Sequence, residues 1–125
     1  MLHSEITEQI IKAFYKVYNT LGYGFLEKVY ENAMAIELRK MGFDYRQQQR
    51  IKVYYENEIV GDYYADLIVN DSVIVELKAS ATIHEEHEAQ LLNYLRATQV
   101  EVGLLLNFGK KPEFKRLIFT NDRKK

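Results

Sequence analysis

The sequence predicts an α/β domain in which a mixed sheet is flanked by helices. Two early segments repeat apolar residues at helical spacing, and the later segments are mostly short and rich in β-branched residues. Their order is helix, helix, three strands, helix and two strands, which is typical of a mixed α+β sheet. We expect residues 1–125 to form a single domain, because the chain is long enough for one core and has no linker-like stretch.

Three segments have helical periodicity. Residues 4–20 are expected to form the first helix, with Ser4 as its N-cap. The second is expected over residues 25–41, where Gly42 ends it, and the third over residues 83–98. Six side chains of the second helix are predicted to enter the core: Leu26, Val29, Tyr30, Ala33, Ile36 and Leu38.

Five segments read as strands, over residues 43–55, 59–69, 72–78, 100–107 and 115–119. The segment 100–107 is continuously apolar, which predicts a strand buried on both faces. Pro112, the single proline, is expected in the turn before the last strand.

Composition excludes several classes of protein. There are no cysteines, which rules out disulfides, thiolate metal sites and cysteine nucleophiles. No apolar run approaches the roughly 20 residues of a membrane span, and the N-terminus lacks a signal-peptide pattern, so we expect a cytoplasmic protein with no membrane partner. The net charge is −1, yet residues 110–125 carry seven basic side chains against two acids. Such a basic edge suits a phosphate-backbone substrate, although Arg123 to Lys125 are interpreted as a frayed terminus.

The most informative residues are Asp66, Glu76 and Lys78, on two consecutive predicted strands. Glu76 and Lys78 are two apart, so their side chains share one face of the strand. Two carboxylates and an ammonium in one place can hold a hard divalent cation and activate a water against a phosphodiester. The alternative is a surface ion pair at a sheet edge.

This interpretation requires a particular register. With a strict two-residue turn at Asn70-Asp71, Val69 would pair with Ser72, and Glu76 would project from the opposite face to Asp66. A shared site needs Val69 opposite Val73, or a bulge. We predict one of these two arrangements.

Two further motifs accompany the three charged residues. The third helical segment contains Q-x-x-x-Y and the start of the second contains G-x-x-E-x-x-Y, as Gln90, Tyr94, Gly24, Glu27 and Tyr30. With these motifs the chain resembles the PD-(D/E)xK nuclease superfamily, in its RecB-like and exonuclease-like branches. It is similar over nearly its full length to the GxxExxY family within it. Ala65 stands where the superfamily motif has proline.

The resemblance implies a restriction-endonuclease-like core and a role for each motif residue. Asp66, Glu76 and the Leu77 backbone carbonyl would bind Mg²⁺ or Mn²⁺, and Lys78 would polarise the attacking water or stabilise charge on the phosphate. Glu27 would be an outer or second-metal carboxylate; its alternative is a residue stabilised by the helix N-terminus.

Four residues are expected on the substrate side of the site. The resemblance implies that Gln90 and Tyr94 line the site or contact the phosphate backbone. They are four apart and share a helix face, and His87 lies on the same face. Gln90 is counted with the catalytic residues, whereas Tyr94, His87 and Tyr30 are predicted to bind substrate. The alternative is that Gln90 and Tyr94 lie on the solvent-exposed face of their helix without a functional role, and that Tyr30 is a half-buried packing residue.

The sequence therefore predicts a metal-dependent nuclease that acts on DNA in preference to RNA, as a homodimer or larger homo-oligomer. The alternative is a non-catalytic nuclease-fold module that binds nucleic acid or a protein partner. A zinc site at His84 and His87 is rejected, because the metalloprotease motif places its histidines four apart and these are three apart.

Overall fold

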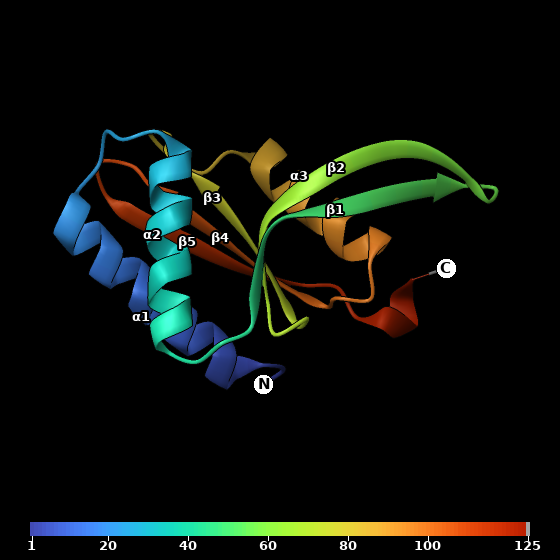
Figure 1. Cartoon of the computed structure of the whole chain (residues 1–125). Coiled ribbons are helices and arrows are strands. Elements are labelled where there is room, and N and C mark those ends of the chain that lie inside the picture. The colour runs from blue at the N-terminus through green and yellow to red at the C-terminus, as the bar shows by residue number, and fades with distance from the viewer. Residues whose placement is uncertain (125) are drawn as a thin grey trace.

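A twisted mixed sheet carries two helices on one face and a third helix on the other (Figure 1). The computed structural model describes residues 1–124. Within these residues the elements are α1 (Ser4–Leu21), α2 (Glu27–Lys40), β1 (Tyr45–Tyr55), β2 (Glu58–Val69), β3 (Val73–Lys78), α3 (Glu85–Ala97), β4 (Val102–Phe108), β5 (Pro112–Ile118) and a short 3₁₀ helix, Asn121–Arg123.

The strands follow chain order, β1-β2-β3-β4-β5. Neighbours pair antiparallel except β3 and β4, which are parallel. A parallel pair needs a crossover, and α3 provides it. The predicted mixed α+β fold and its order of elements are confirmed.

α1 and α2 cover one face of the sheet. α1 buries Ile10, Ala13, Phe14 and Val17. α2 buries mainly one stripe, Tyr30, Met34 and Leu38, against the same strands. Residues four apart lie above one another on a helix, so this stripe is narrow.

Three core predictions for α2 are wrong. Val29 and Ile36 lie outside the buried stripe and are exposed. Leu26 is exposed because it precedes the helix, which begins at Glu27, two residues after the predicted start.

α3 packs on the opposite face through Leu91, Tyr94 and Leu95. It lies close to β4 because Gly103 has no side chain: a β-carbon there would lie 2.8 Å from Leu91 Cδ1. This glycine thus sets how near the helix comes to the sheet.

The register of β2 and β3 matches the arrangement that a shared site requires. Val69 pairs with Val73, and Leu67 pairs with Val75. Asn70 and Asp71 both have left-handed backbone angles (φ 52° and 51°), which is a conformation that these residue types tolerate in turns. The prediction for β4 is also confirmed, since all seven of its residues are buried.

Several predicted boundaries are wrong. Ser4 is the first helical residue and not the N-cap; His3 precedes it, and no side chain caps the helix. Pro112 begins β5 instead of lying in the turn, which an edge strand permits because one side of it has no partner.

The C-terminal basic residues are more ordered than the sequence suggested. Lys124 Nζ donates to the carbonyls of Thr98 (2.9 Å) and Val100 (2.8 Å), and the Arg123 guanidinium lies over the Phe119 ring. The frayed-terminus interpretation is therefore wrong for these two residues, and Lys125 lies outside the described residues. Earlier in the basic stretch, Lys115 Nζ pairs with Glu88 at 2.8 Å.

The β1–β2 hairpin extends beyond the rest of the sheet and curves over α3 (Figure 1). β1 is interrupted at Gln48, whose φ is +52° although its neighbours are extended. Gln48 lies opposite Asp66, and the register of β1 against β2 is the same on both sides of it. The residue therefore changes the direction of the strand without shifting its register. No helix in residues 1–124 is long and apolar enough to cross a bilayer.

Candidate active site

The candidate site lies where β2 and β3 separate. Their backbone pairing covers three positions and ends at Leu67 and Val75. β3 continues alongside β4 as far as Lys78, whereas β2 leaves the sheet to form the hairpin with β1. The next two residues at the point of separation are Asp66 and Glu76, which we call the carboxylate pair.

Each member of the carboxylate pair accepts a backbone hydrogen bond from the other strand. The Asp66 N–H donates to Glu76 Oε2 at 2.7 Å, and the Leu77 N–H donates to Asp66 Oδ2 at 2.8 Å. Side-chain oxygens thus replace the backbone carbonyls as acceptors where the ladder ends. This exchange holds the two carboxyl groups side by side between the strands.

Burial raises the pKa values of both carboxyls of the pair. Glu76 is only 5% exposed, and burial together with the neighbouring Asp66 charge raises its pKa to about 8. Burial also raises the pKa of Asp66, and Glu31 adds to that rise. The Leu77 hydrogen bond and Lys78 act in the opposite direction on Asp66 without cancelling the rise. A buried carboxyl beside a half-buried one, with Lys78 as the nearby positive charge, suits a bound cation.

Lys78 is half-buried at the end of β3. It is near enough to lower the pKa values of both carboxyls of the pair and of His87. Among residues 1–124 its ammonium has no hydrogen-bond or ion-pair partner, so its three donors are free for a bound molecule.

α2 brings two carboxylates to the same region. Glu27 Oε2 accepts a hydrogen bond from the Ala79 N–H at 3.3 Å, beside the end of β3. Glu31, one turn later, is 3% exposed and accepts from Lys28 (3.1 Å), Gln47 (2.7 Å) and Gln48 (2.7 Å).

Gln48 connects Glu31 to the carboxylate pair. Its single amide nitrogen donates to Glu31 Oε1 at 2.7 Å and to Asp66 Oδ1 at 3.3 Å. The left-handed backbone of Gln48 is a conformation that costs a non-glycine residue about 1 kcal/mol or more. Asp66 therefore has both oxygens held, one by Leu77 and one by Gln48.

Within the described chain, residues 1–124, no three His, Cys, Asp or Glu side chains converge as a metal-binding cluster. The carboxylate pair is a site of two carboxylates, and Glu27 lies beside it. Oxygen donors of this kind suit hard divalent cations such as Mg²⁺ or Mn²⁺.

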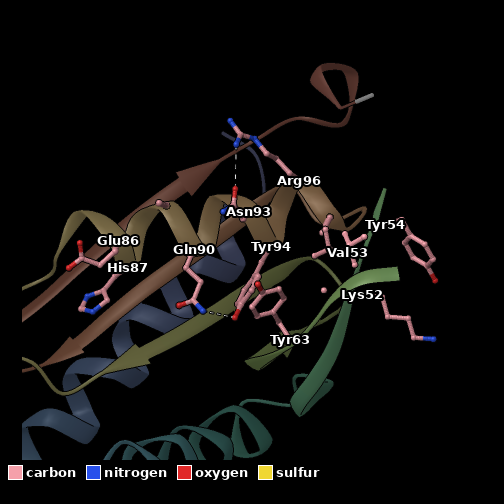
Figure 2. A pocket seen from close by; sticks show the side chains of 14 residues that line it. Lys52, Val53, Tyr54, Tyr63, Glu86, His87, Gln90, Asn93, Tyr94 and Arg96 are labelled. Carbon is pink, nitrogen blue, oxygen red and sulfur yellow. Dashed lines mark hydrogen bonds between the residues drawn. The ribbon is translucent and has the colours of Figure 1, made fainter. Parts of the chain in front are cut away.

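α3 presents the Q-x-x-x-Y motif beside the pair. Gln90 Nε2 donates to the Tyr94 hydroxyl at 2.9 Å, as the dashed line in Figure 2 marks. Burial and the charges of Glu76 and Asp66 raise the pKa of Tyr94 to about 12, so its hydroxyl stays protonated at neutral pH. Burial and Lys78 lower the pKa of His87, whose Nδ1 accepts from the His84 N–H at 3.2 Å. A neutral His87 ring bonded in this way carries its proton on Nε2.

Tyr30 occupies a different environment from the one predicted. Its side chain has no exposed surface, and its ring stacks on Phe108 with centroids 4.1 Å apart. The hydroxyl donates to the Gly22 carbonyl at 2.7 Å and accepts from the Phe25 N–H at 3.2 Å. In this conformation Tyr30 cannot contact a substrate; it fixes the loop before Glu27.

Sequence analysis missed Glu31 and Gln48. Glu31 lies four residues after Glu27, hence on the same helix face, which was the available signal. Nothing in the local sequence around Gln48 indicates a left-handed residue, because glutamine has no special preference for that conformation.

The chain belongs to the PD-(D/E)XK nuclease superfamily, whose family model matches residues 4–117. A search of curated proteins finds no match.

Several solved structures have a similar fold, among them the two that follow. One is the crystal structure of SSO0001, with 18% identity and a TM-score of 0.60, covering 97% of this chain and 62% of that one. The other is an alkaline exonuclease (LHK-Exo) from Laribacter hongkongensis, with 13% identity and a TM-score of 0.54, covering 76% of this chain and 56% of that one. The chain thus spans less than two thirds of either neighbour, and at these identities the likeness shows the fold alone.

The raised pKa of Glu76 predicts how the stability of the metal-free protein depends on pH. The usual pKa of this carboxyl is 4.5 and the folded value is about 8. As pH rises through this window the unfolded chain releases a proton that the folded protein keeps, so stability falls. Between the lower and upper ends of this pH window, the free energy of unfolding of Glu76→Gln should rise by about 1–4 kcal/mol relative to that of wild type.

Urea unfolding in EDTA buffer at several pH values measures this difference. Glu58→Gln, which removes an exposed carboxylate from the hairpin, is the matched control and should show no comparable gain. A Glu76→Gln advantage that does not grow with pH would show that the buried carboxyl ionises without penalty.

Proposed function

We propose that this protein is a divalent-metal-dependent nuclease that hydrolyses phosphodiester bonds in DNA. The observation that carries the proposal is the carboxylate pair, with a buried Glu76 opposite Asp66 and the free ammonium of Lys78 two residues further on. Membership of the PD-(D/E)XK nuclease superfamily supports the same chemistry.

The donor set fits Mg²⁺ or Mn²⁺. Asp66, Glu76 and the Leu77 backbone carbonyl would hold the ion, with Glu27 as an outer carboxylate or a ligand of a second ion. A bound divalent cation supplies Lewis acidity and lowers the pKa of water, which makes a nucleophile available at neutral pH.

Side chains around the pair would position the scissile phosphate. Lys78 would donate to a phosphate oxygen or orient the attacking water, since its ammonium has no partner among residues 1–124. Gln90 would donate the second N–H of its side-chain amide to a phosphate oxygen, while the Tyr94 hydroxyl accepts the first N–H. His87, neutral and carrying its proton on Nε2, would donate to substrate.

Gln48 and Glu31 would act as positioning residues. They touch Asp66, directly or through one another, and not the reacting atoms. Groups that hold a metal-binding carboxylate in place commonly change metal affinity or activity by about 10- to 100-fold when removed. A strained backbone at Gln48 is consistent with such a role.

We also propose that the chain belongs to the GxxExxY family within the superfamily. Its motif has two structural tasks here that support the assignment: Tyr30 fixes the loop that precedes α2, and the helix then directs Glu27 toward the end of β3. The cytoplasmic location and the homodimer or larger homo-oligomer stay predictions from the sequence.

Nuclease activity is tested with a digestion panel of linear duplex DNA, circular duplex DNA, single-stranded DNA and structured RNA, with Mg²⁺ or Mn²⁺. We expect wild type to cleave DNA. Glu76→Ala and Lys78→Ala should each lose at least about 100-fold in rate, because each removes a group that acts on the reacting phosphate or its metal.

Lys12→Ala, an exposed lysine on α1, is the matched control and should cleave like wild type. Equal cleavage by all four proteins would identify a contaminant. Absence of cleavage in every arm would reject the nuclease in favour of a non-catalytic module that binds nucleic acid or a protein.

The positioning role of Gln48 is tested with Gln48→Gly, which removes the amide while allowing the left-handed backbone. We expect Mn²⁺ affinity and the rate of cleavage to fall about tenfold or more, because Asp66 loses one of its two hydrogen bonds. Gln49→Gly adds a glycine to the same strand without removing this bond, and should change neither. Unchanged Mn²⁺ affinity in Gln48→Gly would contradict the role.

A further inference from the structure

A groove lies between α3 and the β1–β2 hairpin (Figure 2). Its volume is about 880 Å³. We call it the hairpin groove and define it by six of its lining residues: Val53, Tyr54 and Tyr63 on the hairpin, and Gln90, Asn93 and Tyr94 on α3.

Three of the residues that line the groove are tyrosines, although the Tyr54 ring points away from the other two in Figure 2. Figure 2 shows the Tyr63 ring beside that of Tyr94, and their centroids are 5.8 Å apart. Tyr63 is 46% exposed and Tyr54 is also exposed, although each is a large aromatic side chain. Exposed aromatic faces in a groove are platforms on which nucleic-acid bases stack.

Two basic residues and one acid belong to the rim of the groove: Lys52, Arg96 and Glu86. In Figure 2 the charged ends of Lys52 and Arg96 point away from the Tyr63 and Tyr94 rings, so their positive charge acts at the rim. Arg96 is held in place by its contact with the Phe119 ring (5.0 Å) and by its hydrogen bond to Asn93. Positive groups beside stacking platforms are the combination that binds single strands.

The groove leads to the carboxylate pair. Tyr94 packs in one cluster with Ala65 and Ile74. Asp66 is the next residue after Ala65, and Glu76 follows Ile74 by two on the same strand face. Gln90 lines the groove and is bonded to Tyr94, so a strand lying in the groove would reach the pair past these two side chains.

The size of the groove distinguishes an unpaired strand from a duplex. A cube of 880 Å³ has an edge of roughly 10 Å, which is less than the width of the major groove of B-DNA alone, about 12 Å. A whole duplex therefore does not fit inside the groove. Paired bases also hide their faces in the stack, whereas unpaired bases leave them free for tyrosine.

We propose that the hairpin groove binds single-stranded DNA and leads it to the carboxylate pair. This rests on the proposed nuclease function, because the groove is assigned the substrate of that site. A DNA end or an unpaired segment is then the form of substrate that the protein takes.

Binding is measured by fluorescence anisotropy with a fluorescein-labelled oligothymidylate, in EDTA buffer so that no cleavage occurs. The other probes are the corresponding thymidylate–adenylate duplex and the oligouridylate RNA. Wild type should bind single-stranded DNA more tightly than the duplex. Tyr63→Ala should weaken that binding about 5- to 100-fold, which is the range for losing one stacking platform.

Two variants separate stacking from folding. Tyr64→Ala is the matched control, since Tyr64 is the next residue, is 52% exposed and does not line the groove; it should bind like wild type. Tyr63→Phe keeps the ring and should also bind like wild type. Thermal unfolding by circular dichroism verifies that each variant is folded.

Four results would overturn the proposal: equal affinity for duplex and single strand, tighter binding of the RNA, equal loss in Tyr63→Ala and Tyr64→Ala, or no binding of any probe. The nuclease proposal is judged separately. Cleavage of duplex DNA in the digestion panel without binding here would reject the groove alone, and single-strand binding without any cleavage would reject the nuclease alone.

Discussion

The separation of β2 from β3 at the carboxylate pair is the constraint on which the rest of the structure depends. Two carboxyl groups take the place of backbone carbonyls as acceptors there, with bonds of 2.7 and 2.8 Å. This satisfies the buried backbone donors that the end of a ladder leaves behind. It also places the buried Glu76 carboxyl against the half-buried Asp66 carboxyl, which is costly unless one stays protonated or a cation binds. The same two side chains therefore satisfy the backbone donors at the end of the ladder and form the candidate metal site.

The same separation creates the space around the site. Because the part of β2 that precedes Asp66 pairs with β1 and not with β3, the hairpin is free to curve over α3 (Figure 1). In β1 the change of direction occurs at Gln48, whose left-handed backbone interrupts the pairing with β2 without shifting its register. Its amide then bonds Asp66 and Glu31, so the residue that bends the strand also holds the site. The groove on the inner side of the bent hairpin follows from the same arrangement.

Local patterns predicted the order of elements and the central charged residues, because both depend on neighbours in the sequence. The register followed from requiring that Asp66 and Glu76 share a face, and the pairing of Val69 with Val73 agrees. What escaped prediction depends on distant contacts. Glu31 is bonded by Gln48 from 17 residues away, and the burial of Tyr30 is set by Phe108. Val29 and Ile36 looked like core residues because periodicity alone does not show how narrow the buried stripe of a helix is.

A titration with Mn²⁺ followed by isothermal calorimetry tests most directly whether the carboxylate pair is a metal site. Wild type should bind the ion, and Asp66→Ala should bind it at least about tenfold more weakly, because one of two charged ligands is gone. Asp122→Ala, which removes an exposed carboxylate from the short C-terminal 3₁₀ helix, should bind like wild type. Failure of wild type to bind Mn²⁺, or equal affinity in wild type and Asp66→Ala, would contradict the account.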